Sequence, residues 1–167
     1  MTTCHDTYTL DELVPPPLPT EQRIVVGVDG SPASMAALRW AARQATCSGG
    51  SLEVVEVYEP VSEIAFAFGG YPAVSPVDPA EVRASALVSL RTAVQTLDEE
   101  PEGLRLIAIA DGSPSHALTR AARGASMLVV GAHNRHGLGL LLGSTASSCV
   151  RHAVCPVVVV PATIAGG

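Results

Sequence analysis

Apolar residues follow two different spacings along this chain. Short runs rich in Val, Ile and Leu have the composition of buried β-strands, and they begin at Arg23, Ser51, Leu104, Ser126 and Cys155. Segments with apolar residues at helical spacing lie between them, and they begin at Ser31, Asp78, Ser115 and Ser144. Because strands and helices alternate, we expect parallel strands joined by right-handed crossovers, and hence a doubly wound α/β domain.

Local signals predict where two of the helices start. Ser31 followed by Pro32 indicates an N-cap serine with proline at the first helical position. Asp78 also precedes a proline, and the helix that follows it is expected to end near Glu99. The second strand, residues 51–60, alternates apolar and acidic residues, which is typical of a strand nearer one side of a sheet.

Proline and glycine content predicts the domain boundaries. Residues 1–22 contain consecutive prolines, which cannot donate ladder hydrogen bonds, so we expect an irregular N-terminal arm. Residues 23–161 form the predicted domain, and residues 162–167 form a C-terminal tail. Residues 61–77 contain two glycines in succession and two prolines, which indicates a long connection inside the domain.

Composition narrows the class of protein. The chain is 47% apolar but only 4% aromatic, which suits small-residue helices on a Val-rich sheet better than a β-sandwich. A net charge of -6 and the absence of a Lys/Arg cluster argue against nucleic-acid binding. We also expect no membrane association and a cytoplasmic location, because the sequence lacks both an apolar run of roughly 18 residues and a signal-peptide pattern.

Four cysteines at irregular spacings favour thiols over disulfides. The candidate ligands for a metal site are His133, His136, Cys149, His152 and Cys155, the last three of which are spaced three residues apart. These residues contain no C-x-x-C pair, and Cys155 precedes a proline that leads into a strand, so we expect no metal centre.

The segment "VVGAHNRHGLGLLLGSTASS" runs from the fourth strand into a helix. Its glycines leave backbone amides accessible, and Ser144 and Thr145 open a helix whose N–H groups and dipole favour phosphate. Asp29 ends the first strand, so it belongs at the same carboxyl edge of the sheet, where open α/β sheets bind ligands. A tight connection without a ligand explains the same residues and stays open as an alternative. The chain has no G-x-x-x-x-G-K-[ST] or G-x-S-x-G motif, so phosphoryl transfer and serine hydrolysis are not predicted.

Three quoted stretches resemble the universal stress protein family, in its bacterial single-domain form. They are "RIVVGVDGSPASMAALRWAARQA", "DGSPSHALTRAARGASMLVVGAH" and "LLLGSTASSCVRHAVCPVVVV", and the resemblance covers about residues 23–161. It implies a Rossmann-like, adenine nucleotide alpha hydrolase-like fold with a five-stranded parallel sheet in the order 3-2-1-4-5. It also implies a homodimer formed through the last strand, here residues 157–160, which agrees with the need to cover an apolar sheet edge.

The resemblance further implies a binding site for ATP, with no metal beyond nucleotide-associated Mg²⁺. Asp29 would face the ribose and the Val57 backbone would meet adenine. The phosphate-binding residues implied are Gly131, Asn134, Gly143, Ser144 and Thr145. The family's loop reads G-x2-G-x9-G-[ST], whereas here Asn134 replaces the second glycine and one residue is missing before Gly143.

Two functions are therefore expected as alternatives. The first is a stress-response sensor or regulator that binds adenine nucleotide, with slow ATP hydrolysis at most. The second is a nucleotide-free dimeric interaction module with a degenerate phosphate loop, acting on a protein partner that the sequence does not identify.

Overall fold

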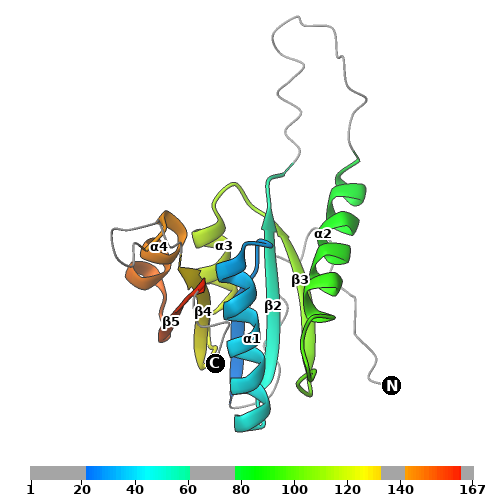
Figure 1. Ribbon diagram of the computed structural model, residues 1–167. Helices are drawn as coiled ribbons and strands as arrows, with labels where there is room; N and C mark the ends of the chain where they lie inside the picture. The colour runs from blue at the N-terminus through cyan, green and yellow to red at the C-terminus, as the bar shows by residue number, and fades with distance from the viewer. Residues whose placement is uncertain (1–21, 61–77, 133–141, 163–167) are drawn as a thin grey trace, which may run out of the picture.

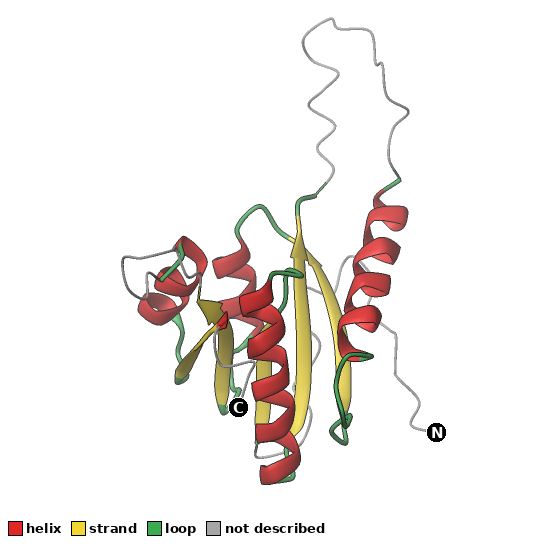
Figure 2. Ribbon diagram, in the orientation of Figure 1, coloured by secondary structure: helices red, strands yellow, loops and turns green. Residues whose placement is uncertain are grey.

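Five parallel strands form the centre of the structure, a computed structural model, and helices cover both faces of the sheet (Figure 1, Figure 2). The strands are β1 (Arg23–Gly27), β2 (Ser51–Tyr58), β3 (Leu104–Ala110), β4 (Met127–Ala132) and β5 (Val157–Pro161). The helices are α1 (Pro32–Ser48), α2 (Pro79–Val94), α3 (Pro114–Ala121) and α4 (Ser144–His152). The strand order β3-β2-β1-β4-β5 confirms the doubly wound sheet that the resemblance implied.

The structure describes residues 22–60, 78–132 and 142–162. Three predicted segments lie outside these ranges: all but the last residue of the N-terminal arm, the 61–77 connection, and all but the first residue of the C-terminal tail. Asn134, within the glycine-rich segment, also lies outside them. In the described part of the chain, no helix is long and apolar enough to cross a membrane.

Helix boundaries follow from short-range hydrogen bonds. The Ser31 side chain caps α1 by accepting from the Ser34 backbone N–H at 3.2 Å, and the Asp78 carboxylate caps α2 by accepting from Ala80 N–H at 2.8 Å, as the sequence predicted. The prediction that the second helix ends near Glu99 was wrong, because α2 ends at Val94. Beyond that point, Thr96 donates both its N–H and its hydroxyl to the Ala93 carbonyl, which closes a tight turn in place of another helical turn.

Successive residues of each strand pack on opposite faces of the sheet. On one face, Ile24 and Val26 of β1 belong to the core formed with α1 and α2. On the other, Val25 belongs to the core that includes Leu118 of α3 and Cys149 of α4. The first half of the chain places β2 and β3 on one side of β1, and the second half places β4 and β5 on the other side. The helices α1 and α2 therefore cover one face of the sheet, and α3 and α4 cover the other.

Candidate functional site

A cavity of about 550 Å³ lies at the carboxyl ends of the strands, where the strand order reverses between β1 and β4. Its walls come from the β1–α1 turn, the end of β2, the start of α3, the end of β4 and the start of α4. Six of the seven residues that the sequence suggested for a ligand site line this cavity, namely Asp29, Val57, Gly131, Gly143, Ser144 and Thr145. The seventh, Asn134, lies outside the described residues.

Asp29 is held at the cavity by the turn that starts α1. Its Oδ1 accepts from Ser31 N–H at 3.0 Å, while its own N–H donates to Ser34 Oγ at 3.2 Å. The Ser34 hydroxyl in turn donates to the Ser31 carbonyl at 3.0 Å. These bonds fix the carboxylate at the end of an apolar strand, in a position suited to accepting hydrogen bonds from a ligand.

Val57 presents backbone groups that β1 does not pair. The register between β1 and β2 ends at Gly27 and Val55, with one further bond from Val28 N–H to the Val55 carbonyl at 2.8 Å. Because backbone groups point alternately to the two neighbouring strands, those of Val57 point to the same side as those of Val55. They therefore lie past the end of β1, where Val57 lines the cavity.

Gly131 is required by the packing of β4 against α1. A β-carbon at this position would lie 2.5 Å from the Ala33 carbonyl carbon and 2.6 Å from the Ser34 nitrogen. Both are backbone atoms in the first turn of α1, so no side-chain rotation would relieve the contact. The close approach brings the end of β4 and the Asp29 turn to the same cavity.

The amino end of α4 forms the wall opposite the Asp29 turn. Gly143 is its N-cap, with φ -59° and ψ 164°, and no side chain among the described residues caps the helix. The first helical bond runs from Ser147 N–H to the Gly143 carbonyl at 2.9 Å, so the amides of Ser144, Thr145 and Ala146 have no partner within the helix. With no acidic residue in the first turn, this end suits an anion.

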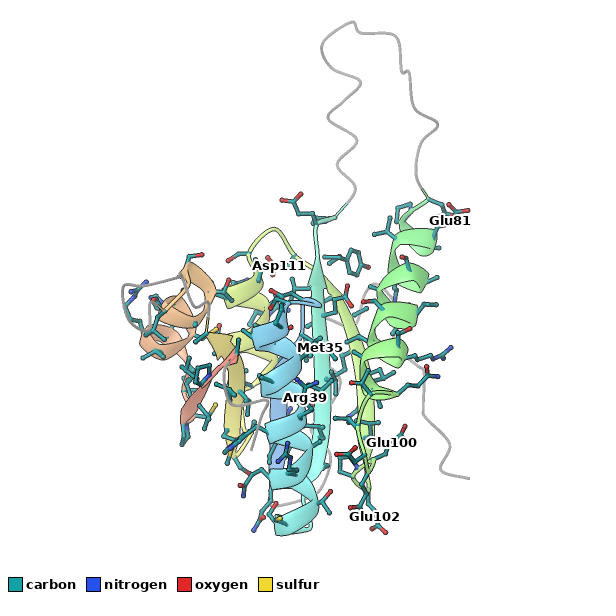
Figure 3. All side chains as sticks on the ribbon, in the orientation of Figure 1. Met35, Arg39, Glu81, Glu100, Glu102 and Asp111 are labelled. Carbon is teal, nitrogen blue, oxygen red and sulfur yellow. The ribbon has the colours of Figure 1, made fainter. Side chains whose placement is uncertain are left out.

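Two carboxyl groups near the cavity edge have shifted pKa values. Burial raises the pKa of Glu56, whose Oε2 has no hydrogen-bond partner among the described residues. The hydrogen bond with the Ser89 side chain opposes this rise in pKa, and the negative charge of Asp29 adds to it. Asp111 lies at the same carboxyl edge, beside the start of α3 (Figure 3). Its hydrogen bond with His116 Nδ1 at 3.0 Å, together with a backbone bond from Ser113, lowers its pKa.

Sequence patterns did not identify every cavity residue. Ser34 lines the cavity although it sits inside a helical pattern, and Val55, Pro114 and Leu118 form apolar parts of the wall. A usable signal existed for Ser34, because a serine three residues after an N-cap serine belongs to the first turn, at the ligand edge. Within the described residues, no group of three His, Cys, Asp or Glu side chains is arranged to hold a metal ion.

Comparisons with known proteins agree with the fold. The sequence profile of the Universal stress protein family matches residues 21–161. A universal stress protein of Mycolicibacterium smegmatis is 36% identical over 143 residues, covering 84% of this chain and 48% of that protein. The chain thus spans about half the length of the curated relatives it matches.

Among solved structures, UspA from Lactobacillus plantarum is similar with a TM-score of 0.62 and 26% identity, over 84% of this chain and 97% of that one. A universal stress protein in complex with cAMP has a TM-score of 0.54 and 24% identity, over 84% and 97% of the two chains. The family profile, the curated relative and the shared strand order lead to one assignment. This chain belongs to the universal stress protein family.

Proposed function

We propose that the cavity at the carboxyl edge of the sheet binds adenine nucleotides, including ATP. In this proposal the domain acts as a nucleotide-binding sensor or regulator in a stress response. The observation that carries this proposal is the convergence of Asp29, the Val57 backbone and the uncapped start of α4 on one cavity of about 550 Å³. That volume falls within the range of roughly 300–1,000 Å³ found for small-molecule sites.

Each part of the nucleotide has a matching group in this proposal. The Asp29 carboxylate accepts hydrogen bonds from the ribose hydroxyls, and the Val57 backbone pairs with the edge of adenine. The amides of Ser144 and Thr145, together with the α4 dipole, bind phosphate oxygens. Asn134 is the remaining phosphate-binding residue in this proposal. The solved relative in complex with cAMP shares the fold, so this architecture accommodates an adenine nucleotide in that protein.

The residues around the cavity favour binding over turnover. Among the described lining residues, Asp29 is the sole ionisable side chain. The described lining therefore contains neither a lysine to neutralise the phosphate being transferred nor a pair of carboxylates to hold a catalytic Mg²⁺. Hydrolysis, if measured, is expected to be slow, with Mg²⁺ carried by the phosphates of the nucleotide.

The start of α4 offers the sharpest test, because helix stability and phosphate binding respond oppositely to charge there. In Thr145→Glu the added carboxylate stabilises the helix dipole but repels phosphate. We expect Thr145→Glu to weaken ATP binding at least tenfold in isothermal titration calorimetry, while its melting temperature stays equal to or above that of wild type. The matched control, Thr145→Gln, should keep most of the affinity.

Asp29→Asn should weaken ATP and adenosine alike, because it removes the negative charge and replaces one of the two oxygens that accept from the ribose hydroxyls with an NH2 donor, while it changes no phosphate contact. Glu102→Gln, at the opposite edge of the sheet (Figure 3), is the control and should leave both affinities unchanged. No saturable binding of ATP, ADP or AMP at millimolar concentration would overturn the proposed function.

A second candidate, the dimeric interaction module, is favoured by the exposed apolar side chains beside β5. Val154 is 77% exposed and Val150 is 50% exposed, and β5 pairs with β4 on one side. Val150 belongs to α4 and Val154 to the turn before β5, so the exposed apolar surface lies next to the edge strand, and a second copy that covers both is expected to stabilise them. Val154→Lys should keep the fold and shift sedimentation from dimer to monomer; a wild-type protein that sediments as a monomer contradicts the dimer.

A further inference from the structure

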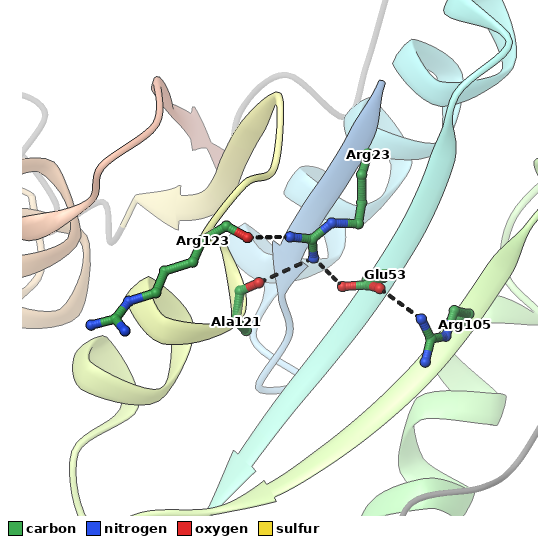
Figure 4. A network of polar contacts seen from close by, with 5 residues as sticks. All are labelled: Arg23, Glu53, Arg105, Ala121 and Arg123. Atoms are coloured by element: carbon green, nitrogen blue, oxygen red, sulfur yellow. Dashed lines mark hydrogen bonds and ion pairs between the residues drawn. The ribbon is translucent and has the colours of Figure 1, made fainter. Parts of the chain in front are cut away.

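A buried network of charged side chains joins three strands to the end of α3 (Figure 4). Arg23 Nη1, from β1, donates to Glu53 Oε2 of β2 at 2.6 Å, and Arg105 Nη1 of β3 donates to Glu53 Oε1 at 3.1 Å. The side chains of Arg23, Glu53 and Arg105 are 3%, 1% and 8% exposed. Arg23 also donates to two backbone carbonyls, those of Ala121 at 3.1 Å and Arg123 at 2.5 Å.

These two carbonyls belong to the carboxyl end of α3. Ala121 is the last residue of the helix, and Arg123 lies in the turn that follows it. Carbonyl groups at a helix end have no partner within the helix, so the Arg23 guanidinium satisfies them and complements the negative end of the dipole. Arg23 therefore works as a cap for α3 supplied by the central strand.

The same helix reaches the cavity at its other end. Leu118 and Pro114 line the cavity, and Leu118 also packs so closely on Gly27 that a β-carbon there would lie 2.8 Å from its Cδ1. Going back along α3 from its carboxyl end, the helix thus meets Arg23, then Gly27, and then the cavity. With only eight residues, α3 is about 12 Å long, so the position of one end sets that of the other.

Stability alone does not account for this arrangement. Burial raises the pKa of Glu53 while the charge and hydrogen bond of Arg23 oppose the rise, and burial lowers the pKa of Arg105, so both groups are desolvated. Arg23 Nε is buried and has no hydrogen-bond partner within residues 22–60, 78–132 and 142–162. Apolar side chains of similar volume generally stabilise a fold as well as such a triad does, but they cannot bond the α3 carbonyls.

We propose that Arg23 is a positioning residue for the cavity, because its bonds to the Ala121 and Arg123 carbonyls hold α3 along β1 and so fix Pro114 and Leu118 in the cavity wall. The effect on nucleotide affinity rests on the proposed function, whereas the effect on α3 does not. Glu53 and Arg105 orient the Arg23 guanidinium and keep its charge compensated.

The test replaces the whole triad, so that no charge is left buried alone. The variant Arg23→Met/Glu53→Leu/Arg105→Met is compared with wild type and with Arg43→Met, an exposed arginine of α1. Hydrogen exchange with mass spectrometry follows the amides of residues 118–123 in the nucleotide-free protein. Calorimetry then measures ATP affinity, and thermal unfolding measures stability.

We expect the triple variant to melt close to the wild-type temperature, because removing the buried charges offsets the loss of the bonds to the Ala121 and Arg123 carbonyls. We also expect it to exchange the α3 amides at least tenfold faster and to bind ATP roughly fivefold more weakly. Unchanged α3 exchange, or faster exchange with unchanged ATP affinity, overturns the positioning role. If wild type binds no nucleotide, the proposed function fails, and the α3 exchange alone then decides whether Arg23 anchors the helix.

Should the triple variant not fold, Arg23→Lys replaces it, because one ammonium group keeps the charge beside Glu53 but cannot reproduce the fork that reaches both carbonyls. Faster α3 exchange in Arg23→Lys, with β1 exchange unchanged, supports the anchor. Equal α3 exchange in Arg23→Lys and wild type overturns it.

Discussion

Gly131→Ala should destabilise this protein strongly, for a reason independent of any ligand. The new β-carbon would lie 2.5 Å from the Ala33 carbonyl carbon, 2.6 Å from the Ser34 nitrogen and 2.8 Å from the Ala33 oxygen. Favourable contacts between carbon atoms lie at about 3.5–4.0 Å, so the first turn of α1 must move by nearly 1 Å relative to β4. The same turn holds Asp29, so the movement also reaches the cavity.

The expected cost is about 3 kcal/mol, the upper part of the usual range for overpacking, because the clash involves backbone rather than side-chain atoms. For a domain of this size, that corresponds to a fall in melting temperature of roughly 6–12 °C. Gly27→Ala should cost only about 1 kcal/mol, because the atoms it meets belong to the Leu118 side chain, which can change rotamer. Gly112→Ala should be neutral within about 0.5 kcal/mol, because no atom of the described residues lies within 4 Å of the added β-carbon and the φ of Gly112 is not positive.

Urea unfolding followed by circular dichroism, with the three variants measured in parallel, gives these free energies. The order of destabilisation expected is Gly131→Ala, then Gly27→Ala, then Gly112→Ala. If Gly131→Ala unfolds with the same midpoint as Gly112→Ala, the packing explanation is wrong. A loss of ATP affinity without a loss of stability would instead mean that Gly131 serves the phosphate loop alone.

Two further predictions concern buried groups. Arg23→Met alone should lower the free energy of unfolding by about 3–5 kcal/mol, because the buried Glu53 carboxylate then keeps only its ion pair with Arg105. The triple variant should not show this loss, because it removes all three charges together. Burial raises the pKa of Cys149 to about 11, so iodoacetamide at pH 8 should modify exposed Cys47 long before Cys149, as read by peptide mass spectrometry. The unfolded thiol ionises near pH 8.5 and the folded one near 11, so stability should fall across that interval in wild type and less so in Cys149→Ala.

Much of the fold was predictable because its signals are local. The caps at Ser31 and Asp78 needed only neighbouring residues, and both were confirmed. The strand order did not follow from periodicity, since alternating strands and helices fit several parallel sheets; it came from the resemblance to a known family. Convergence of Asp29, Val57 and the start of α4 on one cavity follows from topology, because carboxyl ends of parallel strands share one edge.

The buried network was missed because its partners are distant in sequence. Acidic residues alternating along β2 were interpreted only as typical of a strand nearer one side of the sheet, and they gave no indication that Glu53 is buried. Arg23 and Arg105 lie 30 and 52 positions away, and they meet Glu53 only through the register of β1, β2 and β3. Periodicity shows which residues share a face of one strand, but it does not show which charge on the next strand lies beside them.

The glycines of the phosphate-loop pattern do not carry equal information about nucleotide binding. Gly131 is required by the close contact with α1, so this chain would need it even if no nucleotide were bound. Gly143 has a backbone conformation open to any residue, and its lack of a side chain leaves the start of α4 uncapped by its own residue. The proposed phosphate contacts can therefore be tested at the amides of Ser144 and Thr145. A charge placed at Thr145, unlike a change of Gly131, distinguishes a binding site from a tight connection.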